Sequence, residues 1–320
     1  MAKILIHVGF PKTATTTLQK VIFNKLHENG AINYLGRNSN SLNENISKKI
    51  RESWLGIQNN KINLEKYLRD DKLNVYSDEE FLFPEYYLQK KYKSKVNINI
   101  FKYLNRCFLG HEIEFVFVIR NQPEILYSQY VQFYRFFIDS KTDNTIDSHF
   151  FNESRYNSSK FKNQDYNCFF NDVKKIVQPN KIHIIPYESL LLRNIEFIDF
   201  WINVLNIKTN SHKEIIKEGF KSNNINSKKK SNLGTSTNTK PLINASGILL
   251  SSLRNKMPGI YELLKSIFLI FFKNKNSIIV RKFKDNEKHE IIKFYENSNR
   301  LFFKSFSINT SYLKYYISND

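Results

Sequence analysis

The sequence predicts an α/β fold in which a central parallel sheet lies between two layers of helices, with a helical region appended at the C-terminus. Apolar runs typical of strands alternate with helix-like apolar periodicity over residues 1 to 210, which is the pattern of consecutive βαβ units. The strand-like runs are nearly continuous in apolar residues, as in strands buried on both faces. The length of 320 residues and the 41% hydrophobic content, with 27 Phe and 18 Tyr, suffice for one large domain with a substantial core.

The first strand and helix are predicted by the opening residues. Lys3 to Val8 form a short apolar run, which Gly9 and Pro11 bound. After this turn, apolar residues recur at spacings of three and four, which predicts an amphipathic helix from Thr15 to Asn29 with Gly30 as its cap.

The turn between this strand and this helix is suited to an anion. Unpaired backbone N–H groups and the positive end of the helix dipole converge at a helix N-terminus. Lys12 adds a full positive charge, and several hydroxyls add donors that can close around phosphate oxygens. These hydroxyls belong to Thr13, Thr15, Thr16 and Thr17. The alternative interpretation is that the threonines simply cap the helix.

The turn does not fit the nucleotide triphosphatase pattern GxxxxGK[ST]. Counting from Gly9, the second glycine of that pattern falls on Ala14 and its lysine falls on Thr15. The lysine of this chain is instead Lys12, directly after Pro11. The residue that would reach the β- and γ-phosphates of a nucleoside triphosphate is therefore missing from its usual place.

The run from Pro11 to Leu18 resembles the 5′-phosphosulfate loop of sulfotransferases, whose pattern is close to PKxGTTxL. The resemblance implies a P-loop-like three-layer fold and the donor 3′-phosphoadenosine 5′-phosphosulfate (PAPS). Ala14 stands at the family's glycine position, which alanine can occupy where φ stays negative. The donor-binding residues that the resemblance implies in this loop are Pro11, Lys12, Thr13, Ala14, Thr15, Thr16 and Thr17.

A second motif follows the strongest predicted strand, Glu114 to Ile119, which is rich in β-branched and aromatic residues. Pro123 suits the first turn of the helix that comes next, and Arg120 leaves the carboxyl end of the strand, where open α/β sheets place ligands. Arg120 to Tyr130 resembles the family's 3′-phosphate motif R-x-x-x-E-x-x-x-S-x-Y, which implies that Arg120 and Ser128 bind the 3′-phosphate of the donor. Taken alone, an arginine at a strand end is more often part of a surface ion pair.

Candidates for a general base follow another predicted strand, Leu73 to Ser77. Asp78, Glu79 and Glu80 are adjacent there, so their mutual repulsion and the neighbouring Phe and Leu residues would raise at least one pKa. The segment resembles the S-S-E-E-F stretch of bacterial and Golgi-type sulfotransferases. Glu79 aligns best with that stretch as the base, Glu80 is second and Glu28 third, whereas the alternative is that these acids cap a helix or stay solvated.

Two other predictions accompany this one. Lys12 would stabilise the negative charge that builds on the leaving phosphate. His7, on the first strand, is interpreted as a packed histidine and not as a base.

The last core strand is predicted from Lys181 to Tyr187, and a helix runs from Glu188 to Leu205. The string that begins at Tyr187 resembles the Y-E-x-L segment that follows a core strand in sulfotransferases, which supports the fold more than catalysis.

We expect three parts along the chain: a core with the donor site in residues 1–210, a basic loop in 211–244 that orders over the donor, and a helical part in 245–320. Residues 221 to 240 are polar and basic, which is typical of a loop. In the resemblance such a segment covers the adenine and 3′-phosphate, which implies that Lys228, Lys229 or Lys230 reaches the donor. Apolar patterns predict helices over 245–272 and 285–304.

The net charge of +19 is also typical of nucleic-acid-binding proteins. The lysines, however, are spread along the whole chain, and no helix-turn-helix, zinc-ligand or RNA-recognition signature accompanies them. We therefore expect no nucleic-acid partner and interpret the charge as attraction for the donor and for acidic glycans or anionic lipids.

Cysteines and apolar segments bear on location. Cys107 and Cys168 fit neither a disulfide framework nor a metal site, and the sequence opens directly into a core strand without a signal sequence or anchor. We therefore expect a cytoplasmic protein. The apolar run over 266–272 is shorter than the roughly 20 residues that a membrane span needs, so any membrane contact would be peripheral, at the inner face.

These expectations combine into a PAPS-dependent sulfotransferase that transfers a sulfuryl group to an acceptor hydroxyl or amine without a metal and releases adenosine 3′,5′-bisphosphate (PAP). The resemblance to the bacterial carbohydrate branch implies a sugar of a surface glycan, or its lipid-linked precursor, as the acceptor. A small molecule or a lipid is the alternative acceptor. The alternatives from other classes are a nucleotide kinase and a nucleic-acid-binding protein with a degenerate phosphate loop.

Overall fold

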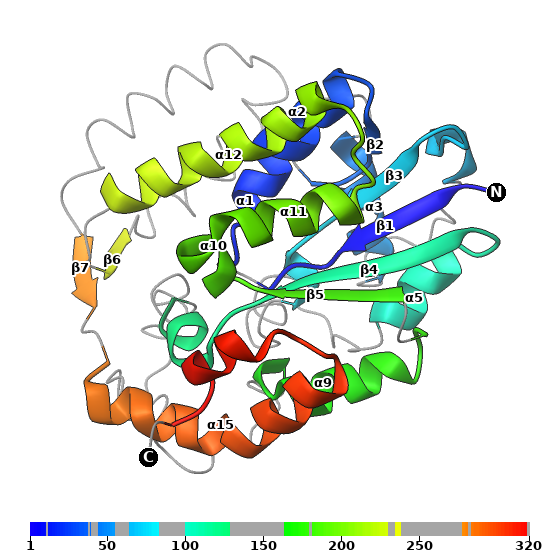
Figure 1. Cartoon of the computed structure of the whole chain (residues 1–320). Helices are drawn as coiled ribbons and strands as arrows, with labels where there is room; N and C mark the ends of the chain where they lie inside the picture. The colour runs from blue at the N-terminus through cyan, green and yellow to red at the C-terminus, as the bar shows by residue number, and fades with distance from the viewer. Residues whose placement is uncertain are drawn as a thin grey trace, which may run out of the picture.

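The computed structural model has a five-stranded sheet at its centre (Figure 1), and all of its strands run parallel. The strand order is β2-β3-β1-β4-β5. The strands are β1 (Lys3–His7), β2 (Ile32–Tyr34), β3 (Leu73–Ser77), β4 (Glu112–Ile119) and β5 (Ile182–Pro186). The structure describes residues 1–10, 12–37, 39, 44–54, 64–82, 100–128, 163–178, 181–229, 234–237, 277–280 and 283–318. The predicted fold class, a three-layer α/β/α arrangement with a parallel sheet, is confirmed.

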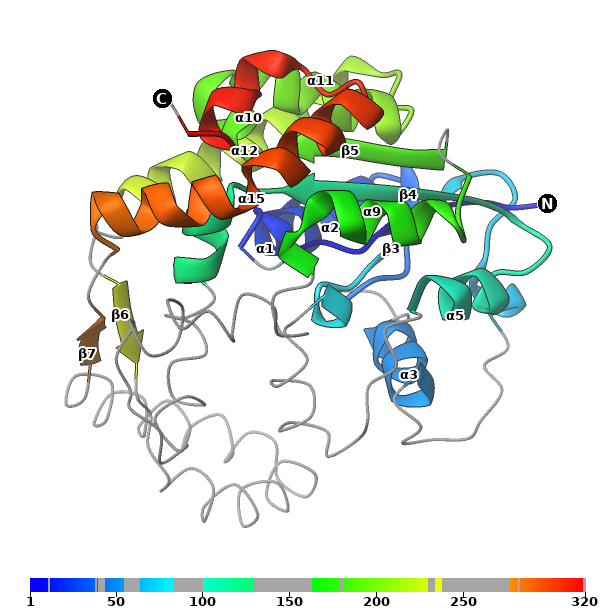
Figure 2. The same ribbon diagram turned by 90° about the horizontal axis from the view of Figure 1, so that it is seen from below.

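Helices cover both faces of the sheet, as the edge-on view shows (Figure 2). The helices that bury the first face are α1 (Thr15–Thr17), η1 (Leu18–Ile22, π-helical), α2 (Phe23–Glu28), α10 (Glu188–Leu192), α11 (Asn194–Val204) and α12 (Asn210–Lys229). The second face is covered by α3 (Glu44–Trp54), α5 (Ile100–Cys107), α9 (Tyr166–Lys174), α15 (Asp285–Ser305) and the short helices η2 (Glu65–Tyr67), η3 (Glu80–Leu82) and η6 (Thr310–Tyr315). A separate two-stranded antiparallel sheet pairs β6 (Gly234–Thr237) with β7 (Ser277–Val280).

Two hydrophobic cores follow from the alternation of side chains along the strands. On β1, Ile4 and Ile6 enter the core shared with α5, α9 and α15, whereas Leu5 enters the core shared with α2 and α11. On β4, Phe115 and Phe117 likewise enter the core shared with α5, α9 and α15. Both faces of the central strands are therefore apolar, which explains the nearly continuous apolar runs in the sequence.

The first helical run confirms the sequence prediction closely. Residues 15–28 are helical, with a π-helical stretch in the middle, and Gly30 follows with a φ of 74°. A left-handed residue is the usual end of a helix, and glycine adopts it without a Cβ clash. The helix of residues 285–304 is also confirmed, as α15.

Three parts of the chain differ from the sequence prediction. β2 has only three residues, which is too short for an alternation signal, and the sequence does not predict it. The expected helix from Glu188 to Leu205 is broken at Arg193 into α10 and α11. The expectation of a basic loop over 211–244 is wrong for residues 211–229, which belong to α12, and for residues 234–237, which form β6. The helix expected over 245–272 lies outside the described residues.

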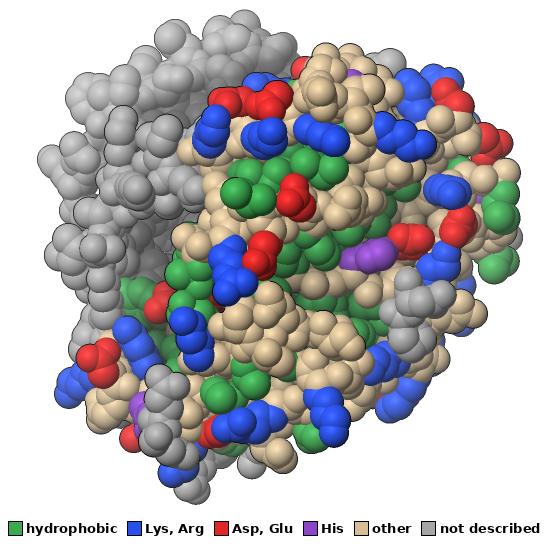
Figure 3. Space-filling view, in the orientation of Figure 1, with side chains coloured by type: hydrophobic (Ala, Val, Ile, Leu, Met, Phe, Trp, Pro, Cys, Tyr) green, Lys and Arg blue, Asp and Glu red, His purple; other side chains and the backbone are tan. Residues whose placement is uncertain are grey.

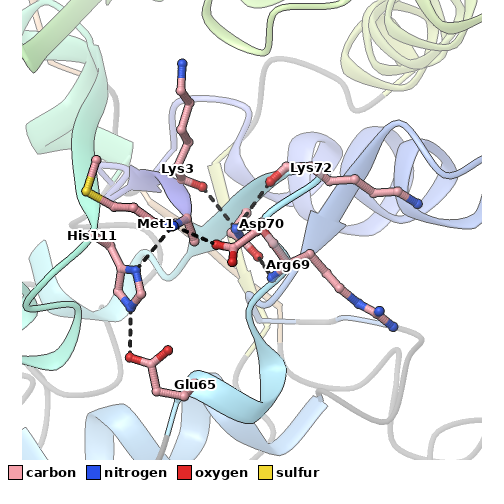
Figure 4. Close-up of polar contacts among 9 residues, drawn as sticks. Met1, Lys3, Glu65, Arg69, Asp70, Lys72 and His111 are labelled. Carbon is pink, nitrogen blue, oxygen red and sulfur yellow. Dashed lines mark hydrogen bonds and ion pairs between the residues drawn. The ribbon is translucent and has the colours of Figure 1, made fainter.

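The amino end of the sheet is tied together by Asn74, which is completely buried. Its side-chain amide donates to the carbonyls of Lys3, Arg69 and Lys72, three of the residues labelled in Figure 4. Nearby, the backbone N–H of Ala2 donates to Nδ1 of His111, whose other ring nitrogen lies 2.9 Å from Glu65. The amino ends of the strands are thus occupied by structural hydrogen bonds. The carboxyl ends of the strands are the side of the sheet that can take a ligand.

Among the described residues, no helix is both long and apolar enough to cross a bilayer.

Candidate functional site

The carboxyl ends of β1, β3 and β4 form the candidate site. The strands β1 and β3 end level with each other, because His7 pairs with Ser77. On the other side His7 pairs with Val116, and β4 continues beyond it to Ile119. Arg120, the residue after β4, therefore lies beyond the end of β1, alongside the loop that follows β1.

The loop after β1 has an unusual backbone. Lys12 has a φ of 71° and Ala14 a φ of 62°, both in the left-handed region. The Thr13 hydroxyl donates to the Phe10 carbonyl at 2.6 Å, and the Thr15 hydroxyl lies 3.4 Å from the same oxygen. These two buried hydroxyls hold the loop in shape, while Lys12 and Thr16 are exposed.

The N-terminus of the helix that follows faces this loop. Ala14 is its N-cap and offers no side chain to the first N–H groups, and its carbonyl accepts from the N–H groups of Thr17 and Leu18. The first N–H groups and the positive end of the helix dipole are therefore directed at the space above the loop. The arrangement has the chemistry of a phosphate site.

Ala14 does not meet the condition under which alanine replaces glycine without strain. Its φ is positive, and a Cβ in this region crowds the backbone at a cost of roughly 1–2 kcal/mol. Such strain at a non-glycine residue is concentrated at functional sites in proteins, where the surrounding structure maintains it.

Beneath the loop lies His7, which is a packed histidine. It is completely buried, and burial lowers its pKa to about 3. Its Nδ1 lies 2.9 Å from the Ser77 hydroxyl, which also accepts a hydrogen bond from the Gln19 amide. A Cβ on Gly9 would lie 2.9 Å from both His7 Nε2 and Thr15 Oγ1, so the loop needs glycine at this position.

The structure brings the second motif into contact with the first. Arg120 donates from Nη1 to the carbonyl of Lys12 at 3.1 Å, and its Nη2 lies 3.2 Å from Glu124. The guanidinium also lies over the ring of Tyr187, 5.0 Å from its centroid. Ser128 is half-buried in the helix of residues 122–128 that follows Arg120. Two residues that are far apart in the sequence thus define one site.

The turn of residues 120–122 is supported by side chains that the sequence did not mark as functional. Tyr166 donates its hydroxyl to the Arg120 carbonyl, and Glu188 accepts from the backbone N–H of Asn121 at 3.0 Å. Glu188 belongs to the Y-E-x-L string, which was the only signal for it in the sequence. Tyr166 carried no such signal, because its role depends on a contact across the fold.

The three adjacent carboxylates after β3 have different surroundings. Asp78 is fully buried and accepts from Ser47 at 2.7 Å and from Arg51 at 2.6 Å. Glu80 is also buried, and its two carboxylate oxygens lie 2.9 Å from Arg37 and 3.2 Å from Arg51. These two acids form a buried cluster with two arginines, which sequence reasoning missed.

The close approach of two strands places Arg37 in that cluster. A Cβ on Gly36 would lie 2.7 Å from the backbone nitrogen and oxygen of Ser77, so only glycine lets the chain pass there. The next backbone N–H, of Arg37, donates to the Ser77 carbonyl.

Glu79 differs from its two neighbours. Among the described residues, none forms a hydrogen bond or an ion pair with its carboxylate. Burial raises its pKa, an effect that the charges of Asp78 and Glu80 reinforce and those of Arg37 and Lys12 oppose. The Lys12 charge is thus near enough to influence this carboxylate. Glu79 therefore has the environment of a general base, and Glu80 is held in ion pairs.

Not all predicted residues can be placed in the site. Glu28 is exposed at the far end of the first helical run, about 20 Å from its start at the usual rise per residue. Pro11 lies outside the described residues, as do the side chains of Lys228 and Lys229, although the backbone of both lysines is helical. In the described part of the chain, no group of three or more His, Cys, Asp and Glu side chains could hold a metal ion.

Comparison with known proteins gives structural matches only. No family model and no curated protein sequence matches the chain. A mouse sulfotransferase, SULT7A1, solved in complex with PAP, matches 68% of this chain with 10% identity and a TM-score of 0.34. The chain spans 64% of the length of that protein. Retinol dehydratase, solved with androsterone and the inactive cofactor PAP, matches 96% of this chain and 82% of its own with 12% identity and a TM-score of 0.39.

Proposed function

We propose that this protein is a PAPS-dependent sulfotransferase. The observation that carries the proposal is the hydrogen bond from Arg120 to the Lys12 carbonyl, which joins the two motifs at neighbouring strand ends. A donor with phosphates at both the 5′ and the 3′ positions requires two anion sites, and these two motifs offer them side by side. A site for a simple phosphate would need only the first.

The residues of the site fit this donor. The loop backbone and the residues Pro11 to Thr17 would hold the 5′-phosphosulfate, with Lys12 supplying a positive charge and Thr16 an exposed hydroxyl. Arg120 offers a planar fork to the 3′-phosphate, and Ser128 a compact donor. Lys228 and Lys229 remain proposed donor ligands, since α12 carries the basic segment at its C-terminal end.

The proposed chemistry is an in-line transfer of the sulfuryl group from the donor to the acceptor. The acceptor oxygen attacks sulfur and its proton passes to the Glu79 carboxylate, while the bond from sulfur to the phosphate oxygen breaks and PAP leaves. Lys12 and the N–H groups at the helix N-terminus stabilise the charge that develops on that oxygen. Glu80, held by two arginines, fixes the segment that presents Glu79.

The acceptor is proposed to be a sugar hydroxyl or amine of a bacterial surface glycan or of its lipid-linked precursor. This proposal rests on the resemblance of the motifs to the carbohydrate branch. A small molecule or a lipid is the alternative acceptor, and an assay that follows PAP release with each class of acceptor distinguishes them.

Nucleic-acid binding and nucleotide phosphorylation are the competing functions. On the face drawn in Figure 3, the described Lys and Arg side chains are scattered among Asp and Glu side chains and form no single large patch. For a kinase, Thr15 stands where the phosphate-binding lysine would be required.

The test is calorimetry of the full chain with PAP, with ATP and with a single-stranded oligonucleotide, each with and without magnesium. We expect PAP to bind without magnesium and more tightly than ATP. Tighter binding of ATP that depends on magnesium would indicate a kinase. Steeply salt-dependent binding of the oligonucleotide, together with indifference to the 3′-phosphate, would indicate a nucleic-acid-binding protein.

A further inference from the structure

The turn that carries Arg120 is held by a ring of four buried side chains from distant parts of the chain. The members of this buried ring are Gln122, Glu188, Asn299 and Tyr316. Glu188 is 6% exposed, and the other three are completely buried. Two members come from residues 283–318, at the opposite end of the sequence from the phosphate loop. Figure 1 shows α15 and the segment that follows it beside α9, in agreement with the packing in the core.

The ring closes through Glu188 and Tyr316. One carboxylate oxygen of Glu188 accepts from the backbone N–H of Asn121 at 3.0 Å. The other accepts from the Tyr316 hydroxyl at 2.6 Å. The carbonyl of Tyr316 in turn accepts from the Asn299 amide at 2.7 Å. A single residue of the C-terminal segment therefore contributes at both its side chain and its backbone.

The remaining side of the ring is an amide pair. The Gln122 amide donates to Asn299 Oδ1 at 2.8 Å, and the Asn299 amide donates to Gln122 Oε1 at 3.1 Å. The orientation of both amides is fixed, because Gln122 also donates to the Gln164 carbonyl at 3.1 Å and Asn299 to the Tyr316 carbonyl. Buried networks that are satisfied in this way are rigid, since any shift leaves a polar group unpaired.

The ring contacts the turn at two consecutive residues, Asn121 and Gln122, directly after Arg120. The Arg120 guanidinium contacts the Lys12 carbonyl and the ring of Tyr187. Tyr187 directly precedes Glu188, and its backbone N–H donates to the Ile119 carbonyl at 2.7 Å. The same short segment thus supports the turn through a carboxylate and the guanidinium through an aromatic face.

We infer that the buried ring positions the Arg120 guanidinium for the 3′-phosphate of the donor, so that the C-terminal residues 283–318 are part of the donor site. The inference rests on the proposed function and names Tyr316 and Glu188 as positioning residues. They touch neither donor nor acceptor. Their effect is on the discrimination between nucleotides with and without a 3′-phosphate.

The test compares two tyrosine variants from the same short stretch. Tyr316→Phe removes the hydroxyl that donates to Glu188. Tyr312→Phe is the matched control, because the Tyr312 hydroxyl donates to Glu196 at the same distance of 2.6 Å and Tyr312 is 3% exposed, but Glu196 has no contact with the turn among the described residues. Calorimetry measures the affinity of each full-length variant for PAP and for adenosine 5′-monophosphate, which lacks the 3′-phosphate.

We expect Tyr316→Phe to weaken PAP binding about tenfold, as the loss of one charge-assisted hydrogen bond predicts, and to leave monophosphate binding within about twofold. Tyr312→Phe changes neither. Glu188→Gln, which keeps the side-chain shape, weakens PAP binding similarly, and the double variant is no weaker than the stronger single effect, because both remove the same contact.

Equal losses for both nucleotides, or the same loss in Tyr312→Phe, would overturn the inference and indicate a role in stability alone. Unchanged PAP binding in Tyr316→Phe and in Glu188→Gln would overturn it as well. If the folded wild-type protein does not distinguish PAP from the monophosphate, the proposed function fails first and the inference fails with it. The wild-type titration thus separates the two failures.

Discussion

The phosphate loop after β1 and the Arg120 turn after β4 meet at one hydrogen bond but are maintained in different ways. Within the loop, the hydrogen bonds of Thr13 and Thr15 reach only as far as Phe10, and two residues have positive φ. Within the turn, the partners are Tyr166, Glu188 and Asn299, which come from three later parts of the chain. One site is shaped locally by strained backbone and the other by buried long-range contacts.

This difference separates two ways in which the donor site can fail. A change in the loop acts on neighbouring residues and on the 5′ end of the donor. A change in the ring acts across the fold and reaches the 3′ end. Glu79, after β3, is expected to affect the binding of neither end of the donor, since its proposed role is in the chemical step.

The largest effect is expected from Glu79→Gln. Loss of a general base lowers turnover by roughly two to four orders of magnitude, while PAP affinity stays close to that of the wild type. Steady-state rates and PAP titrations on the same preparation measure both. Unchanged turnover would remove Glu79 from the role. A large loss of PAP affinity would mean that the carboxylate belongs to the donor site after all.

The pH dependence of turnover is a second test of whether Glu79 acts in the chemical step. Because burial raises the pKa of Glu79, the base becomes protonated at a higher pH than an ordinary glutamate does, and turnover falls about tenfold per pH unit below that pKa. The residual rate of Glu79→Gln should lack this acid limb. If turnover of the variant fell in acid with the same midpoint as that of the wild type, the titrating group would be another residue.

Stability should change in the opposite direction to activity. A raised pKa in the folded state means that the group favours folding in acid and that this contribution is lost as pH rises through the folded pKa. Glu79→Gln should therefore be more stable than the wild type at neutral pH, with the difference disappearing below the pKa of an unfolded glutamate. Urea denaturation at several pH values measures this. A destabilised variant at neutral pH would contradict it.

The next largest effect is expected in the buried ring. Asn299→Leu keeps the volume but removes the donor to Gln122 Oε1 and to the Tyr316 carbonyl and leaves the Gln122 amide with Gln164 alone, so the free energy of unfolding should fall by about 3 kcal/mol. Asn171→Leu is the control, because the Asn171 side chain is exposed and its one hydrogen bond to a described residue is a contact of 3.4 Å with Asn167, so this change should alter stability by less than about 0.5 kcal/mol. Equal effects of the two changes would mean that the ring is not rigid.

The smallest effect is expected in the loop. Ala14→Gly relieves the strain of a positive φ and should stabilise the protein by about 0.5–1 kcal/mol, in spite of the entropy that glycine costs. Ala31→Gly, at a residue without positive φ, should destabilise it. Denaturant midpoints compare the two. A destabilised Ala14→Gly would contradict the strained geometry of the loop.

The sequence predicted what local chemistry determines. Four of the five core strands and the first helical run were predicted because apolar runs and spacings mark them directly. The sequence predicted only that Arg120 and Lys12 lie on the same side of the sheet, because both follow the carboxyl ends of parallel strands. It did not predict their hydrogen bond. The ring was not predictable, since Gln122 and Asn299 are ordinary polar residues whose pairing depends on a contact between opposite ends of the fold.

The two arginines that hold Asp78 and Glu80 show the same limit. Three adjacent acids in the sequence gave no means of telling which of them would form ion pairs and which would have none with the residues that the structure describes. Arg37 reaches Glu80 only because Gly36 lets β2 and β3 approach closely. The preference for Glu79 had rested on the motif alone, and the burial of its neighbours in ion pairs gives it a physical reason.

The central claim is that Lys12 and Arg120 form one site for the two ends of a donor with 5′ and 3′ phosphates. The most direct test is magnesium-free calorimetry of Lys12→Ala and Arg120→Ala with PAP and with adenosine 5′-monophosphate. Lys12→Ala should weaken both nucleotides, and Arg120→Ala should weaken PAP alone, each by about 10- to 100-fold for the loss of charged contacts. PAP binding that survives unchanged in Arg120→Ala, or its absence from the folded wild type, would contradict the account.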